Sequence, residues 1–159
     1  MKINCWTLGK GHEAYVKPGV EEFTKRISRY FKVEWTILPV PKNASLMSEA
    51  DLKKKEGELI LSLLKKEDYL IALDENGKPF SSEGLAEFIT ERSQESLKNL
   101  VFLIGGAYGI DQPVLKRANR IWSLSSLTFP HQLVRLILAE QIYRACSIMK
   151  NEKYHHGNS

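Results

Sequence analysis

The sequence has few cysteines and no long apolar run. Its two cysteines, Cys5 and Cys146, are far apart and lack the short spacing of a metal-ligand set. We expect both to be buried free thiols, and we expect no metal site. No stretch approaches the roughly 18 consecutive apolar residues of a membrane span, and the N-terminus lacks the basic, apolar and small-residue pattern of a signal peptide. We therefore expect a cytoplasmic protein that contacts no membrane.

The sequence also lacks internal repeats and low-complexity segments, and its charge is only mildly one-sided. Hydrophobic residues make up 43% of the 159 residues and charged residues 26%, which is ordinary for a soluble globular protein. We expect one domain over residues 1–159. The formal charge of +4 permits an anionic partner such as RNA but does not require one.

Short apolar runs alternate with amphipathic segments along the chain. The runs predict strands over residues 3–8, 33–38, 69–73, 100–104 and 121–124. The intervening patterns predict helices over residues 18–30, 48–64, from Ser81 or Ser82 onward, after Asp111 and Pro113, and over 132–149. This alternation predicts an α/β fold, with a mostly parallel sheet of about five strands and helices on both faces.

Two local expectations accompany this assignment. Asn76-Gly77 is a strong turn pair, so we expect residues 74–78 to turn the chain after the third strand. We expect residues 53–56 to lie on the solvated face of the second helix, opposite a leucine-rich stripe.

The last predicted helix is apolar on nearly opposite faces. One face carries Val134, Leu138, Ile142, Ala145 and Met149, and the other carries Leu136, Ala139 and Tyr143. A helix of this kind must be buried on more than one side. The sheet can cover one side, and we expect a second subunit of a homodimer to cover the other. The alternative is that the C-terminal tail covers it.

The fourth and fifth strands end in segments that suit exposed backbone. Residues 105–109 are rich in glycine, and residues 125–131 follow the fifth strand. In a parallel sheet, two such strand ends form a ligand crevice. The glycine segment matches neither the dinucleotide nor the P-loop motif. Its glycines allow positive φ and close approach of a ligand, although a plain tight turn is the alternative.

Two further groups of residues suggest chemistry. His131 lies at a strand-to-helix junction, where functional side chains gather, although a lone histidine is more often structural. Arg135, four residues later, can contact solvent, a carboxylate or a phosphate. The tail residues Lys153, Tyr154 and His155 combine charge with rings, as an RNA contact does, although tails often fray.

Several segments together resemble the RlmH family of ribosomal RNA methyltransferases, over essentially the whole chain. They are residues 128–132, 134–135, 140–145 and 154–155, with Leu73, 77–78, 81–83 and 104–106. The resemblance implies the SPOUT fold, an α/β fold with a C-terminal trefoil knot. It also implies methylation of N3 of a pseudouridine in 23S rRNA, on the assembled ribosome, with S-adenosylmethionine as methyl donor.

The resemblance implies particular site residues as well. Cofactor contacts are expected at Leu73, Gly105, Leu124, Ser125, Ser126, Leu127, Thr128 and Phe129. Methyl transfer to N3 requires removal of a proton, and the candidates for this task are His131, Tyr154 and His155. Arg135 is the candidate for substrate positioning, and residues 150–159 are expected to be a functional tail.

Two other functions remain open from the sequence. One is a non-enzymatic RNA- or ribosome-binding factor with an α/β fold, which would have no affinity for S-adenosylmethionine. The other is a small nucleotide- or flavin-binding protein of the flavodoxin type, which an absorbance spectrum would detect.

Overall fold

The computed structural model describes residues 1–157, so Asn158 and Ser159 of the expected tail lie outside the described residues. The chain forms a five-stranded sheet in the order β2-β1-β4-β3-β5, and all of its strand pairs are parallel. The strands are β1 (Lys2–Leu8), β2 (Lys32–Leu38), β3 (Tyr69–Lys78), β4 (Asn99–Ile104) and β5 (Arg120–Trp122). The predicted parallel α/β sheet is confirmed.

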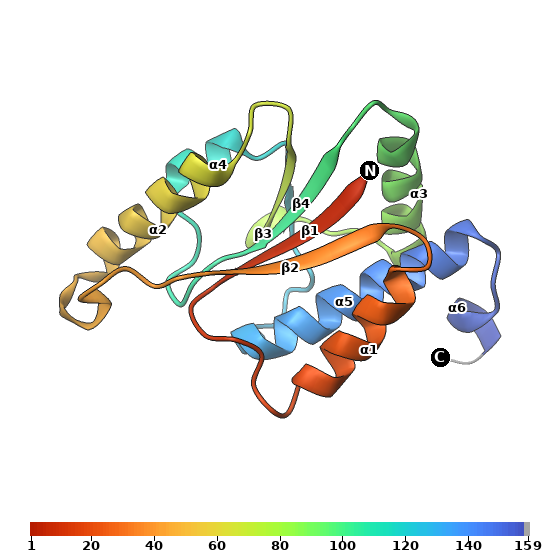
Figure 1. The fold of residues 1–159 in the computed structure, drawn as a ribbon, viewed down its shortest axis with the longest axis horizontal. Helices are drawn as coiled ribbons and strands as arrows, with labels where there is room; N and C mark the ends of the chain where they lie inside the picture. Colours follow the sequence, from red (N-terminus) through yellow and green to blue (C-terminus); the bar gives the residue numbers. More distant parts are fainter. Residues whose placement is uncertain (158–159) are drawn as a thin grey trace.

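Helices cover both faces of this sheet (Figure 1). They are α1 (Lys17–Ile27), α2 (Glu49–Leu63), α3 (Ser82–Gln94), α4 (Gln112–Arg117), α5 (His131–Met149) and α6 (Tyr154–Gly157), with the short 3-10 helix η1 (Ala44–Leu46). Helices α1, α3 and α5 share one core with the sheet, while α2 and α4 share a second core with its other face. Adjacent β3 residues such as Leu70 and Ile71 belong to different cores, because successive side chains of a strand point to opposite faces.

Serine caps begin two of the helices, at Ser48 as the sequence predicts and at Ser81, one of the two serines that the sequence offers for the next helix. Ser48 Oγ accepts a hydrogen bond from the Asp51 N–H at the start of α2, and Ser81 Oγ accepts one from the Gly84 N–H at the start of α3. Each bond satisfies a backbone donor that lacks a partner inside the helix. Both cysteines are buried and unpaired, as expected. Among the described helices, none has the length and apolar character needed to cross a membrane.

The predicted turn over residues 74–78 is instead an interruption within β3. Leu73 and Lys78 both pair with Trp122 of β5, so the residues between them bulge out of the ladder. The Asp74 carboxylate accepts a hydrogen bond from the Asn76 N–H and closes the bulge. A Cβ on Gly77 would lie 2.6 Å from the Ile121 backbone. The turn chemistry was therefore correct, but the strand resumes after it.

The expected reason for a dimer at α5 is wrong. Leu136 lies against α1, where a Cβ on Gly19 would be 2.6 Å from Leu136 Cδ1. The Tyr143 ring lies 6.0 Å from the Phe23 ring of α1 and 4.7 Å from the Tyr154 ring of the tail. Helix α1 and the tail of the same chain therefore cover the face assigned to a second subunit. The trefoil knot and the homodimer themselves stay predictions.

Candidate functional site

A cavity of about 540 Å³ lies at the carboxyl ends of β3, β4 and β5. Its walls come from the β3 bulge, the loop after β4 and the loop after β5. The lining includes the expected cofactor residues Leu73, Gly105, Leu124, Ser125, Leu127, Thr128 and Phe129. Ser126 is exposed and does not line the cavity. The structure therefore brings together, from three separate segments, all but one of the residues expected to bind a cofactor.

The glycine loop, residues 105–109, forms one wall. The glycine with positive φ in this loop is Gly109, at +88°. A Cβ on Gly105 would lie 2.6 Å from Ile110 Cγ1, so Gly105 is needed for close packing within the loop. The Gly109 N–H donates to the Gly106 carbonyl at 3.1 Å. The loop is thus both a tight turn and a cavity wall.

The loop after β5, residues 123–130, uses its serines to hold its own shape. Ser125 Oγ accepts a hydrogen bond from the Leu127 N–H at 3.0 Å, and Ser123 Oγ donates to the Ser125 carbonyl at 3.1 Å. Leu127 is 71% exposed although it lines the cavity. A large apolar side chain that faces both solvent and a cavity can gain burial when a ligand binds.

His131 begins α5 and lines the same cavity. Partial burial lowers its pKa, a hydrogen bond with the Gly105 backbone raises it, and the positive charge of Arg135 lowers it further; the net direction is downward. A histidine with a lowered pKa is neutral at pH 7 and can accept a proton. Of the expected catalytic side chains, His131 is the one that the structure places at the cavity.

Arg135 is buried and does not line the cavity. Only 2% of its surface is exposed, and its Nη1 lies 3.3 Å from His12 Nδ1. Burial lowers the pKa of Arg135, and burial followed by the charge of Arg135 lowers the pKa of His12. Among the described residues, no carboxylate forms an ion pair with Arg135, and its Nε has no hydrogen-bond partner. The sequence suggested solvent, a carboxylate or a phosphate, and the structure shows a buried cation beside a histidine.

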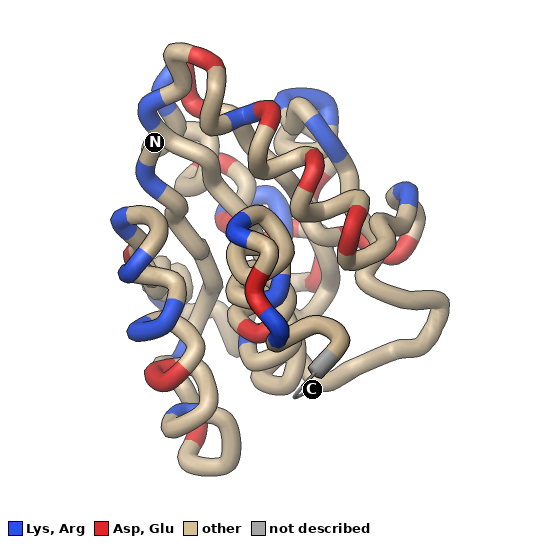
Figure 2. Tube along the Cα trace, turned by 90° about the vertical axis from the view of Figure 1, so that its right-hand side faces the viewer, with Lys and Arg blue, Asp and Glu red and all other residues tan. Residues whose placement is uncertain are grey.

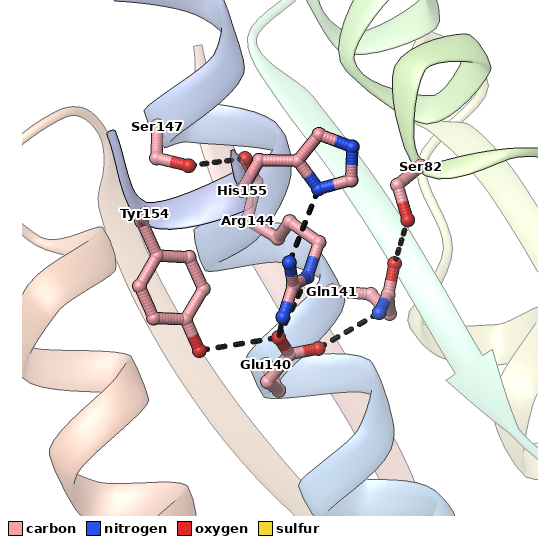
Figure 3. Close-up of polar contacts among 7 residues, drawn as sticks. All are labelled: Ser82, Glu140, Gln141, Arg144, Ser147, Tyr154 and His155. Atoms are coloured by element: carbon pink, nitrogen blue, oxygen red, sulfur yellow. Dashed lines mark hydrogen bonds and ion pairs between the residues drawn. The ribbon is translucent and has the colours of Figure 1, made fainter. Parts of the chain in front are cut away.

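The tail folds back onto the C-terminal half of α5 (Figure 3). The Tyr154 hydroxyl donates to the Glu140 carboxylate at 3.2 Å, and the same carboxylate pairs with Arg144 at 2.6 Å. Arg144 Nη1 lies 3.1 Å from His155 Nδ1, and His155 Nε2 lies 2.6 Å from Glu83 Oε1. An arginine can only donate, so His155 Nδ1 must accept, and Nε2 then carries the hydrogen that is donated to Glu83.

This position separates the tail from the cavity of the same chain. Glu140, the tail's partner, is nine residues beyond His131, or about 13 Å at 1.5 Å per helical residue. The expected placement of Tyr154 and His155 beside His131 is therefore not seen within one chain. Burial first, and then the charge of Glu140, raises the pKa of Tyr154, so its phenol stays protonated at neutral pH.

Glu56 is a residue that the sequence analysis missed. It was assigned to a solvated face, yet it is 6% exposed. A Cβ on Gly106 would lie 2.7 Å from both carboxylate oxygens of Glu56, so this carboxyl group lies directly behind the glycine loop. Burial raises its pKa, and Oε1 has no hydrogen-bond partner. The available signal was Gly57, because a glycine inside a helix often marks a close approach of another segment.

A parallel sheet with a ligand cavity at its carboxyl edge is common to several classes of protein, and comparison with known proteins identifies which one. Residues 1–155 match the family described as "Predicted SPOUT methyltransferase". The chain therefore belongs to the SPOUT methyltransferase family and is a methyltransferase. This membership removes the support for a non-enzymatic factor and for a flavodoxin-type protein.

Particular relatives are similar over almost their whole length. "Ribosomal RNA large subunit methyltransferase H" of Cytophaga hutchinsonii is 47% identical over 156 residues, which cover 98% of this chain and 100% of the relative. The protein of the same name from Flavobacterium johnsoniae is 46% identical over 156 residues, which cover 98% of this chain and 99% of the relative. A solved structure of a probable methyltransferase from Bordetella pertussis aligns with a TM-score of 0.54 at 13% identity, covering 90% of this chain and 93% of that one. The latter similarity supports the fold alone.

Proposed function

We propose that this protein transfers a methyl group from S-adenosylmethionine to N3 of a pseudouridine in 23S rRNA, on the assembled ribosome in the cytoplasm. The observation that carries the proposal is the cavity, since segments far apart in sequence converge there on the residues expected to bind the cofactor. The name of the full-length relatives, ribosomal RNA large subunit methyltransferase, supports the substrate class.

The residues at the cavity fit S-adenosylmethionine. A volume of about 540 Å³ is within the range of small-molecule sites. Backbone groups of the glycine loop and of residues 123–129 would bind the polar edge of the adenine, while Leu73, Leu124 and Leu127 would form the apolar walls. When bound, the cofactor supplies a methyl group that is already activated by the positive sulfur.

The chain's own tasks are then to orient the reactants and to remove a proton. Alignment of the accepting nitrogen with the methyl group supplies much of the rate enhancement in reactions of this kind. His131 is the first residue of α5 and interacts with the Gly105 backbone at the cavity. In its neutral form it would accept the proton from N3. Tyr154 would act as a hydrogen-bond donor to the base and not as a proton acceptor, because its pKa is raised.

The distribution of charge favours the assembled ribosome over free RNA as the substrate. In the view of Figure 2, Lys and Arg lie on several segments of the chain, and one helix carries mainly Asp and Glu. The net charge of +4 is modest for a protein that would have to hold free RNA by charge alone. Ribosomal surfaces that surround the target would supply the contacts that the small chain lacks.

We propose that the active form is a homodimer and that residues 150–159 form a functional tail. Within one chain the tail is far from the cavity, so a role for Tyr154 and His155 requires a second copy or a movement of the tail. Leu133 and Ile137, one helical turn apart on α5, are only half-buried and suit a contact between copies. Light scattering that shows a stable monomer would contradict the dimer.

The test uses ribosomes from a strain that lacks this protein. Incubation with labelled S-adenosylmethionine should transfer label to 23S rRNA, and nucleoside mass spectrometry should identify N3-methylpseudouridine. Ribosomes from the parent strain, which are already methylated, serve as the control and should accept little label. Label on another nucleoside would contradict the assigned target, and absence of transfer with confirmed cofactor binding would contradict the assigned substrate.

A further inference from the structure

Glu56 is a buried acid that the proposed reaction does not use. It lies on α2, is 6% exposed and has no hydrogen-bond partner at Oε1. Among the described residues, none forms an ion pair with it. An unpaired buried acid is unfavourable when it is ionised, and burial accordingly raises its pKa.

Its position relates it to the cavity. A Cβ on Gly106 would lie 2.7 Å from the carboxylate oxygens, and Gly106 lines the cavity, so the Glu56 carboxyl group lies close behind this part of the cavity wall. Lys53, one turn earlier on α2, reaches the cavity directly. Glycine has no side chain, so a charge behind this wall acts on a bound ligand through little intervening protein.

The other charged groups near Glu56 or at the cavity come from α2, from the residue before α4 and from the β3 bulge. On α2, Lys53 is the cation that lines the cavity. Asp111, which precedes α4, touches Gly57 beside Glu56. Across the cavity, Asp74 and Glu75 of the β3 bulge also line it. The local balance is acidic, which favours a ligand of positive charge.

We propose that Glu56 makes the cavity prefer the cationic sulfonium cofactor over the uncharged thioether that methyl transfer leaves behind. This inference rests on the proposed function. In the reaction the bond from methyl to sulfur breaks, a bond from methyl to N3 forms, and the N3 proton passes to a base. The sulfur thereby loses its positive charge. An ionised Glu56 attracts the sulfonium and has no such attraction for the thioether, so it favours entry of the cofactor and release of the spent product.

Proton linkage predicts the direction in which cofactor affinity changes with pH. In the free protein the raised pKa keeps Glu56 protonated up to a higher pH than an exposed glutamic acid. A cation bound in the cavity stabilises the ionised form and lowers that pKa. Binding of S-adenosylmethionine therefore releases protons, and its affinity rises with pH through the raised pKa of the free protein. Binding of S-adenosylhomocysteine, whose sulfur is neutral, releases fewer protons.

Isothermal titration calorimetry of the full chain tests this directly. Both ligands are titrated into the parent protein, Glu56→Gln and Glu58→Gln, in two buffers of different ionisation enthalpy. The preference for S-adenosylmethionine over S-adenosylhomocysteine should fall by about tenfold in Glu56→Gln, and its extra proton release should disappear. Glu58 lies on the same helix with an exposed side chain, so Glu58→Gln should match the parent.

Each outcome is decisive. An unchanged preference and unchanged proton release in Glu56→Gln would overturn the role of Glu56. If Glu56→Gln does not fold, equal proton release by the two ligands in the parent protein would overturn it, while Glu56→Asp, which keeps the charge, should retain most of the preference. If the parent protein binds neither ligand, the proposed function fails and not this inference alone.

Discussion

The two ends of α5 differ in how well their polar groups are paired. At its C-terminal end, Glu140 pairs with Arg144 and accepts from Tyr154, and His155 is held between Arg144 and Glu83. Near its N-terminal end, Arg135 is buried, and within residues 1–157 no carboxylate forms an ion pair with it. Behind the neighbouring glycine loop, Glu56 of α2 is buried, and among the described residues its Oε1 has no hydrogen-bond partner. A fully paired network fixes a shape, whereas unpaired buried groups are unfavourable until a ligand compensates them. The cavity end therefore suits a ligand, and the tail end suits a fixed scaffold.

The largest expected effect is a loss of methyl transfer when the tail at the C-terminal end of α5 is deleted and the cavity at its N-terminal end is left intact. Deletion of residues 150–159 removes Tyr154 and His155 but leaves the cavity lining intact. We expect methyl transfer to fall by more than about a hundredfold, with cofactor affinity unchanged by calorimetry. A shorter deletion of residues 158–159 is the control. Full transfer by the longer deletion would contradict a role for the tail, and lost affinity would mean that the tail contributes to the cofactor pocket.

The next effect concerns the cavity end alone. A side chain at Gly105 would meet Ile110, so Gly105→Val should lower stability by about 1–3 kcal/mol and abolish measurable cofactor binding. At Gly109 a Cβ meets no atom within 4 Å, but φ is +88°. Gly109→Ala should therefore cost about 1 kcal/mol through backbone strain and leave measurable binding. Urea unfolding and calorimetry distinguish them, and equal behaviour of the two variants would contradict the packing argument.

A smaller effect should appear in the pH dependence of stability. The pKa of Glu56 is raised in the folded state, whereas an unfolded glutamic acid has a pKa of about 4.3. The unfolded chain thus releases this proton first, and stability falls as pH rises from that value through the folded pKa. Glu56→Gln should remove this loss, and it should raise stability at pH 7.5 by about 1 kcal/mol.

The measurement is thermal unfolding of the parent protein and of Glu56→Gln at a series of pH values between about pH 4 and about pH 8. The difference between the two proteins should shrink toward the acidic limit, as Glu56 becomes protonated in the unfolded as well as the folded state. A constant difference at every pH would assign the effect to packing and not to charge.

The smallest effect is expected at Arg135. Replacement of a buried guanidinium that has no ion-pair partner by an apolar side chain of similar length changes the free energy of unfolding little or increases it. Arg135→Met should therefore change stability by less than about 1 kcal/mol. Arg135→Ala leaves a cavity and should be clearly less stable. Denaturant unfolding compares them. If Arg135→Met is strongly destabilised, His12 and its surroundings compensate the charge, and the cavity end is better paired than the contacts indicate.

Local rules predicted the sheet and much of the site from the sequence. Continuous apolar runs marked the buried strands, and the serines at positions 48 and 81 began helices because their side chains cap free N–H groups. The family resemblance implied Leu73, Gly105 and Leu124 as cofactor contacts, and their position at the ends of parallel strands explains why they lie at one cavity.

The failures share a different cause. Glu56 follows three lysines and looks solvated, and its burial depends on a glycine loop some fifty residues later in the chain. Arg135 contacts His12, which is 123 residues away, and His155 of the tail contacts Glu83, which is 72 residues away. Which segment meets which is set by tertiary packing, so no pattern within a local window contains that information.

The shape of the sheet margins limits how copies of the protein can associate. At one margin, β5 has three residues and its neighbour β3 bulges beside it. At the other margin, β2 carries the exposed charges Lys32 and Glu34. Short, bulged or charged margins resist the addition of a foreign strand. Continuous sheets across two molecules, and the aggregation that follows from them, are therefore disfavoured, and any ordered pairing of copies must use helical surfaces.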